Sequence, residues 1–92
     1  MYLHIGNGHI VLRREVLAIL DKKTSMASCD TRAYIERYKK KNELININVC
    51  GREISSYIVT IKEDGNTVIY STPLKSSTLV KRMNSVVDGE WM

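Results

Sequence analysis

The side chains in this sequence with the clearest chemical potential are basic ones that stand at the ends of short β-prone segments. Loops at strand ends are where a rigid scaffold presents contacts to a ligand. Arginine offers a planar, two-pronged donor to phosphate or guanine, and lysine offers a point charge. We therefore predict that the three arginines of this set contact a phosphate or a base, with the two lysines as weaker electrostatic support. The set consists of Arg52, Arg13, Arg14, Lys22 and Lys23.

Each of these side chains also has a simpler interpretation, which is solubility or an ion pair with a neighbouring acid such as Glu15 or Glu53. One copy of so short a chain would make only a few phosphate contacts and would bind weakly. An oligomer that repeats the basic surface would add those contacts through multivalency. The prediction of double-stranded DNA as a partner therefore depends on self-association.

The net charge of +4 is concentrated in the middle of the 92-residue chain. Residues 13–52 carry ten basic and five acidic side chains, so the rest of the chain is slightly acidic. A positive region attracts polyanions because their counterions are released on binding. The same charges are typical of a solvated helix face, and the basic helix expected at 32–41 offers an acidic protein a docking surface. A protein-interaction or assembly module without DNA binding is therefore the alternative.

Patterns typical of enzymes, metal sites and cofactor sites are absent. The segment from Gly6 begins like a dinucleotide-binding loop, but Val11 occupies the place of the third glycine and a strand follows where a helix is required. The two histidines and two cysteines lack the spacing of zinc ligands. A nucleophile–base pair of Cys50 with His9 stays open, since spacing alone does not exclude it. We predict no catalytic residue, no metal, no cofactor and no small-molecule ligand.

The cysteine count and the apolar pattern favour a cytoplasmic protein. Two cysteines are too few for a disulfide-built secreted scaffold of this length. No apolar run approaches the roughly 20 residues that a membrane helix needs. Residues 1–5 lack the basic region and small-residue cleavage site of a signal peptide. We therefore expect no membrane partner.

Strand and turn patterns predict one domain over residues 1–87, followed by a frayed tail at 88–92. An Asn-Gly step after Gly6 and the polar run 63–66 are typical hairpin turns. Alternation of apolar residues with asparagine at 45–49 is typical of a half-buried strand. The expected strands are 2–5, 9–12, 16–20, 45–49, 57–62 and 67–71.

Two helices are expected. The first runs from a cap at Ser28 or Asp30 to about Lys41, and the second starts at Ser76 or Ser77. Apolar residues at helical spacing predict the inward faces of both. These faces comprise Ala33, Tyr34, Ile35 and Tyr38 in the first helix, and Leu79, Val80 and Met83 in the second.

The resulting fold class is α+β, a small and mainly antiparallel sheet with two short helices. The run 16–20 is apolar without alternation, so it needs cover on both faces. The helices of so small a domain cover one face, which leaves the other for a second subunit. The sheet edges also lack proline and inward charge, which favours pairing between copies. We therefore predict a homo-oligomer.

Several stretches resemble the bacterial extracellular matrix regulatory proteins A and B. The similarity runs from residue 1 to about 83, and its opening and its 71–79 stretch look most like the B member. The stretches are Met1-Tyr2-Leu3-His4-Ile5-Gly6, Ile10-Val11, the apolar run ending in Asp21, and Ser71-Thr72-Pro73-Leu74-Lys75-Ser76-Ser77-Thr78-Leu79 with Arg82.

The resemblance implies a DNA-binding transcriptional activator of biofilm matrix genes. It also implies a ring-shaped homo-oligomer whose fold is akin to LytTR-type DNA-binding domains, with basic residues facing DNA. The family's Gly-Arg-Arg stands here as Gly51-Arg52-Glu53, so Arg52 matches a DNA-contacting arginine and Glu53 replaces the second. Another such arginine falls near Glu15, next to Arg13 and Arg14.

Overall fold

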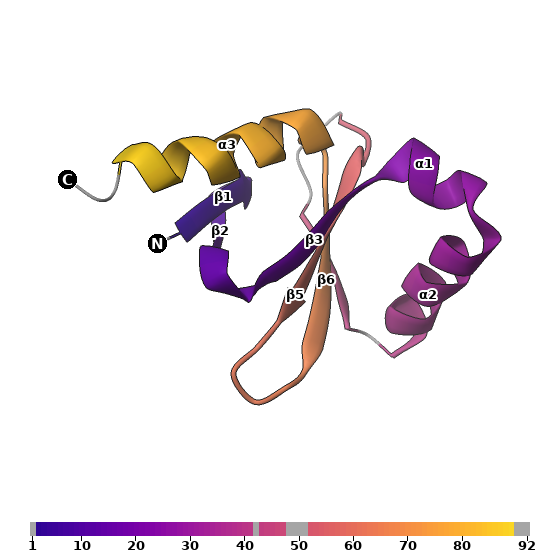
Figure 1. The fold of residues 1–92 in the computed structure, drawn as a ribbon. Helices are drawn as coiled ribbons and strands as arrows, with labels where there is room; N and C mark the ends of the chain where they lie inside the picture. Colours follow the sequence, from indigo (N-terminus) through magenta and orange to yellow (C-terminus); the bar gives the residue numbers. More distant parts are fainter. Residues whose placement is uncertain (1, 42, 48–51, 90–92) are drawn as a thin grey trace.

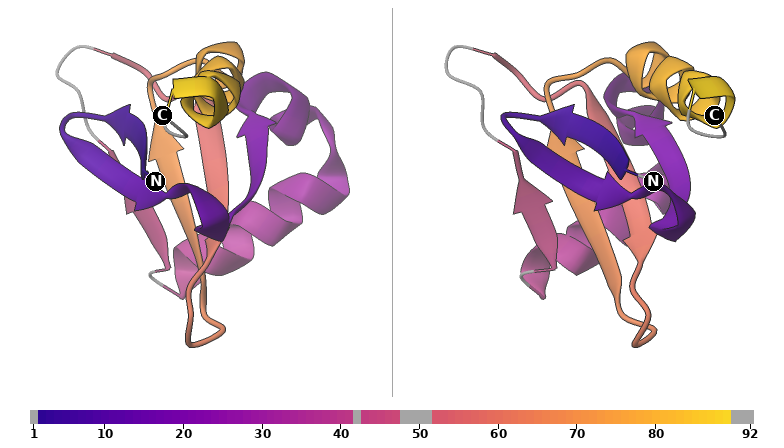
Figure 2. Two further views of the ribbon diagram at one scale, coloured as in Figure 1. Left: turned by 60° about the vertical axis from the view of Figure 1, so that its left-hand side comes forward. Right: turned by 90° about the vertical axis from the view of Figure 1, so that its left-hand side faces the viewer.

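The computed structural model describes residues 2–41, 43–47 and 52–89, which form three layers (Figure 1). A four-stranded sheet lies in the middle, with strand order β3-β5-β6-β4. A two-stranded hairpin and α3 lie on one side of it, and α1 and α2 lie on the other (Figure 2). The strands are β1 (Tyr2–Gly6), β2 (His9–Leu12), β3 (Val16–Asp21), β4 (Leu44–Asn46), β5 (Ser56–Ile61) and β6 (Thr67–Thr72). The helices are η1 (Arg13–Glu15, a 3₁₀ turn), α1 (Lys22–Ala27), α2 (Cys29–Lys40) and α3 (Ser76–Gly89).

The α+β class and the mainly antiparallel pairing are confirmed. β3 pairs antiparallel with β5 and β5 with β6, while the short β4 pairs parallel with β6. The hairpin of β1 and β2 forms around Asn7 and Gly8, which both have positive φ. A second hairpin joins β5 to β6 through residues 62–66. Both turns lie where the sequence predicts them, because Asn-Gly and Asp-Gly steps tolerate positive φ.

Each face of the central sheet is covered in part by this same chain, whereas the prediction left one face wholly to a second subunit. Every residue of β3 nonetheless stays half-buried or exposed, so further cover of this strand by a second subunit stays a prediction. Ile58 packs against the hairpin and α3, while its neighbour Val59 packs against α2 on the other face. β3 follows the same division, with Ile19 in the first cluster and Leu20 in the second. The prediction counted only helices as cover, whereas the β1–β2 hairpin covers a face as well. Leu17 is left 61% exposed at the open edge of β3.

The described residues form three α-helices, so the expectation of two is wrong. The additional helix, α1, is only six residues long and carries no apolar stripe, so no periodicity could reveal it. Asp21 caps it by accepting a hydrogen bond from the amide of Thr24 at 3.1 Å. Ser28 caps α2 in the same way, as predicted, by accepting from the amide of Thr31 at 3.4 Å.

Most of the predicted inward helix faces are confirmed, with two exceptions. In α2, Ile35 is buried, but Ala33 is exposed. In α3, Leu79 is buried, but Val80 is 46% exposed. The helix α3 continues to Gly89, past the residue at which the tail was expected to begin, and residues 90–92 lie outside the described part.

The strand expected at 45–49 is present only in part. β4 comprises Leu44–Asn46, and the amide of Ile47 continues the pairing by donating to the carbonyl of Ser71 at 2.8 Å. Ile47 is fully buried, whereas Ile45 is 42% exposed. The predictions for Val49, Cys50 and Gly51 fall on residues outside the described part. β4 is therefore a short edge strand, opposite to the edge formed by β3.

Gly6 lets the hairpin approach the central sheet closely. Its φ is +117°, and a Cβ at this position would lie 3.1 Å from the Thr72 hydroxyl oxygen. That hydroxyl donates to the carbonyl of Ile5 and accepts from the amide of Leu74 at 3.2 Å. The contact therefore connects the hairpin, the end of β6 and the approach to α3.

We expect Gly6→Ala to lower the free energy of unfolding by about 2–4 kcal/mol, since it combines a strained φ with a steric contact. Gly8→Ala is the matched control, because Gly8 has a positive φ of +77° but no neighbour within 4 Å of the new methyl group. It should cost only about 1–2 kcal/mol. Urea unfolding measures both, and equal losses would show that the contact with Thr72 is unimportant.

Candidate nucleic-acid interface

The five predicted contact residues lie at two opposite ends of the central sheet. Arg13 and Arg14 belong to η1, directly before β3, and Lys22 and Lys23 begin α1, directly after it. The six residues of β3 separate the two groups by roughly 20 Å at the usual rise per residue of a strand. The structure therefore does not bring all five together into one site.

Arg52 lies at the same end of the central sheet as Lys22 and Lys23. The amide of Lys22 donates to the carbonyl of Ser55 at 2.9 Å, and the amide of Ser55 donates to the carbonyl of Thr72 at 2.9 Å. Arg52 lies three residues before Ser55 in the same segment. These bonds hold three chain segments side by side at this end of the sheet.

The third segment contributes a basic residue that the sequence reasoning missed. Lys75 lies three residues after Thr72, directly before α3, and its side chain is exposed. The sequence feature that could have pointed to Lys75 is its position directly before Ser76, a predicted helix cap. Lys23 and Arg52 are exposed as well, and Lys22 is half-buried. We call these four residues the Lys22 cluster: Lys22, Lys23, Arg52 and Lys75.

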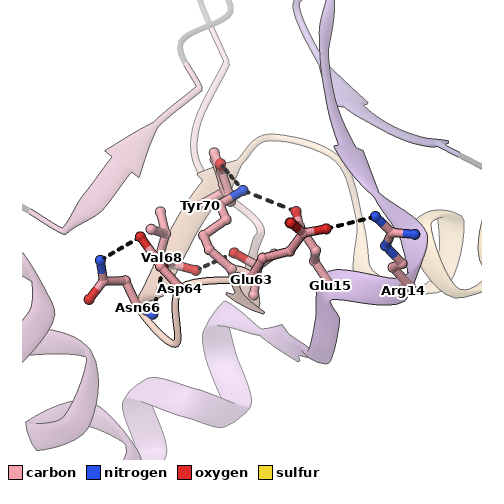
Figure 3. A network of polar contacts seen from close by, with 9 residues as sticks. Arg14, Glu15, Glu63, Asp64, Asn66, Val68 and Tyr70 are labelled. Carbon is pink, nitrogen blue, oxygen red and sulfur yellow. Dashed lines mark hydrogen bonds and ion pairs between the residues drawn. The ribbon is translucent and has the colours of Figure 1, made fainter.

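The other end of the sheet is electrostatically compensated (Figure 3). Arg14 donates to Glu63 in the β5–β6 turn at 3.0 Å, in an ion pair whose side chains are 71% and 81% exposed. Lys62 donates to Glu15 at 3.2 Å and to the hydroxyl of Tyr70 at 3.2 Å. Arg13 is half-buried beside them. Arg14 thus has an acidic partner, although it is Glu63 and not a sequence neighbour.

The Lys62 contact is the more buried of the two ion pairs, since the Glu15 side chain is only 11% exposed. Burial lowers the pKa of Lys62, but the hydrogen bonds to Tyr70 and Glu15 outweigh that effect and raise the pKa above its usual 10.5. The folded state therefore holds this proton more tightly than the unfolded chain. The stabilisation is fully present below about pH 10.5 and is lost as the pH rises through the raised value.

We expect Lys62→Ala to reduce the free energy of unfolding by about 1–3 kcal/mol, because it leaves Glu15 half-enclosed without its partner. Arg14→Ala is the matched control and should cost less than about 1 kcal/mol, since its ion pair is exposed. Urea unfolding at neutral pH compares the two. An equal effect of both substitutions would contradict the unequal burial described above.

The outer face of α2 is a second basic surface. After the exposed Asp30 in its first turn, the exposed charged side chains of this helix are four bases and one acid. The basic end coincides with the C-terminus of the helix, where positive charge is favourable. The residues are Arg32, Glu36, Arg37, Lys39 and Lys40.

The described residues provide few groups for other chemistry. No group of three or more His, Cys, Asp or Glu side chains within them could hold a metal ion. Cys29 is exposed, and Cys50 lies outside the described part, so the pairing of Cys50 with His9 stays a hypothesis. None of the described helices combines the length and the apolar character needed to cross a bilayer.

Comparison with known proteins identifies relatives over most of the chain. The model of the family described as "Extracellular matrix regulatory protein A-like" matches residues 2–83. Extracellular matrix regulatory protein B of Bacillus subtilis (strain 168) is 32% identical to this chain over 82 residues, which is 89% of each of the two chains. Both matches agree with the resemblance that the sequence motifs indicate.

Proposed function

The chain belongs to the extracellular matrix regulatory protein A-like family, and from this premise we propose that it is a DNA-binding transcription regulator that acts as a homo-oligomer. It regulates genes of the extracellular matrix, and it acts in the cytoplasm. It performs no catalysis and needs no cofactor.

The observation that carries the proposal is the convergence of three chain segments in the Lys22 cluster. Two consecutive backbone hydrogen bonds join these segments through Ser55. Four basic side chains therefore occupy one end of the sheet, against the two nearby acids Asp21 and Glu53. Asp21 is engaged in capping α1, which leaves Glu53 as the acid that opposes phosphate. The basic excess supports contact with the phosphate backbone more than sequence readout.

We rank Arg14 below the Lys22 cluster, because its exposed ion pair with Glu63 competes with a phosphate contact. Arg13 stays a candidate, but only for DNA that extends along the sheet from the Lys22 cluster. The two arginines were predicted to rank above Lys22 and Lys23. The geometry supports the reverse order.

The open sheet edges support the proposed self-association. β3 and β4 are the two outer strands of the same sheet, so each protomer has two different edges with unpaired backbone groups. Leu17 is 61% exposed at one edge, and Ile45 is 42% exposed at the other. Contact between two unlike edges is head-to-tail, and such contacts form a ring where the rotation between neighbouring protomers closes. A ring of LytTR-like protomers, each with its Lys22 cluster, is the assembly we propose.

Salt titration tests the DNA-binding proposal. Fluorescence anisotropy with a labelled duplex gives the affinity at several salt concentrations. Each phosphate contact contributes a slope of about −0.9 to the logarithm of affinity against that of salt, so several protomers must give a steep line. Negligible binding at moderate salt would exclude the proposal and favour the second candidate.

The second candidate is a protein-interaction module that binds an acidic partner through α2. The exposed basic face of that helix favours this candidate. It is separate from the Lys22 cluster, so an acidic protein could bind there without DNA. Acidic peptides should then compete for the protein where duplex DNA does not. Loss of peptide binding on substitution of Lys39 and Lys40 would identify this face as the site.

A further inference from the structure

A hollow of about 770 Å³ lies beside the Lys22 cluster, between the end of β3 and three helices. This volume is in the range of sites that bind small ligands. Hydroxyl groups dominate its polar lining, and aliphatic side chains from β3 and α3 line it as well. Those hydroxyls come from Thr24 and Ser25 of α1, from Ser28 and Thr31 at the start of α2, and from Ser76, Ser77 and Thr78 at the start of α3.

The first turn of α3 faces this hollow without a side-chain cap among the described contacts. The first amides of an α-helix have no acceptor within the helix. Asp21 and Ser28 satisfy such amides in α1 and α2. The residue before α3 is Lys75, which has no acceptor group, and no hydrogen bond of the described residues reaches the amides of Ser76 to Thr78. These donors, which carry the positive end of the helix dipole, are available to an anion.

Ser25 provides an independent indication on the opposite wall. The residue is 4% exposed, and its hydroxyl makes no hydrogen bond with any other described residue. Buried hydroxyl groups normally have a partner. No fully enclosed polar side-chain atom of the described residues lacks one, so this oxygen reaches the open volume of the hollow that Ser25 lines. A ligand in the hollow would supply a partner for this hydroxyl in place of solvent.

The hydrogen-bond donors around the hollow favour an anion. Its ionic side chains are Asp21 and Lys81, one of each sign. The Asp21 carboxylate already accepts hydrogen bonds from the amide and the hydroxyl of Thr24, which offset its negative charge. The amides at the start of α3 and the Ser25 hydroxyl are all donors for which the described residues provide no acceptor. Phosphate oxygens are strong acceptors of several such bonds at once.

We propose that this hollow binds a phosphate group through the amides of Ser76 to Thr78 and the hydroxyl of Ser25. Two sources provide this chemistry, a small phosphorylated molecule or the backbone of DNA bound at the neighbouring Lys22 cluster. The site is independent of the proposed function, because it requires neither DNA binding nor self-association.

Amide NMR of the full chain during titration with sodium phosphate tests the site. We expect saturable shifts of the Ser76, Ser77 and Thr78 amide signals, whereas sodium chloride at equal ionic strength should not reproduce them. Ser25→Ala should weaken phosphate binding about tenfold, since it removes one hydrogen bond to a charged group. Thr67→Ala is the control, because it removes a hydroxyl from the opposite end of the sheet. Equal phosphate affinity in Ser25→Ala and the original protein would overturn the assignment.

A pair of variants at one position isolates the backbone donor. Ser76→Pro removes the first amide of α3 at a helix position that proline tolerates, and Ser76→Ala keeps that amide but loses the hydroxyl. Phosphate affinity should fall further in the proline variant. Equal affinity of the two variants would exclude the amide of Ser76 from the site.

Competition identifies the source of the phosphate group. Displacement of phosphate by duplex DNA supports the DNA backbone, and tighter binding of a nucleoside monophosphate than of inorganic phosphate, unaffected by duplex, supports a small molecule. The absence of any saturable shift with phosphate, with the monophosphate and with duplex would overturn the proposal, whatever the anisotropy assay shows for DNA binding.

Discussion

The triple variant Lys22→Ala, Lys23→Ala, Arg52→Ala is expected to lose DNA affinity roughly 10- to 100-fold at moderate salt for each protomer that contacts the duplex. Each lost contact is an exposed charge pair worth up to about 1 kcal/mol. The slope of log affinity against log salt should also become shallower by about 2.7 for each protomer that contacts the duplex. The fold should persist, because Lys23 and Arg52 are exposed and Lys22 contacts Ser55 only through its backbone amide.

The matched control removes the same charge from the outer face of α2, in the triple variant Arg37→Ala, Lys39→Ala, Lys40→Ala. All three side chains are exposed, and the net charge falls equally. A general electrostatic attraction would weaken equally in both variants, whereas a defined interface weakens mainly in the first. A larger loss in the control would move the DNA interface to α2 and contradict our assignment.

The variant Leu17→Asp is expected to dissociate the oligomer. Leu17 is 61% exposed in the protomer, so the substitution costs little folding energy. At the proposed contact it would remove a buried leucine, worth about 1.5–3 kcal/mol, and enclose a charge instead. Self-association should therefore weaken by more than roughly 100-fold, as measured by sedimentation velocity. Ile10→Asp is the control, because Ile10 is 47% exposed on β2, away from both outer strands of the sheet.

A mixing experiment tests whether the contact joins two unlike edges. Leu17→Asp places a charge at the β3 edge, and Ile45→Asp places a charge at the β4 edge, so each substitution prevents contact through its own edge. Each variant alone should be monomeric, but each keeps the edge that the other has lost. An equimolar mixture should therefore form a dimer and stop there. A mixture that stays monomeric would contradict head-to-tail pairing of β3 with β4.

Local chemistry made much of the fold predictable. The Asn-Gly step placed the first hairpin, and Ser28 marked the start of α2 because a cap requires a short polar side chain. α1 was missed because six residues span less than two turns and show no apolar repeat. The sequence did not reveal that the β1–β2 hairpin packs on one face of the sheet, because this packing depends on tertiary contacts and not on local sequence. Nothing in 2–12 distinguishes a hairpin at the sheet edge from one that lies across a face.

The candidate site was predictable in residue type but not in arrangement. Arg13, Arg14, Lys22 and Lys23 are neighbours in sequence, yet an extended strand separates them into two groups. Lys75 is distant in sequence and joins the Lys22 cluster only because the end of β6 pairs with the segment that precedes β5. The Arg14–Glu63 ion pair likewise depends on the β5–β6 turn reaching η1. Such contacts follow from sheet register, which single-residue patterns do not encode.

The central claim is that several copies assemble and together present the Lys22 cluster to DNA. Light scattering during size-exclusion chromatography, with and without a duplex, measures it most directly. We predict a molar mass that is a multiple of the 10.5 kDa protomer without DNA, and co-elution of the intact assembly with the duplex. A mass of one protomer at every concentration, with or without DNA, would contradict the account.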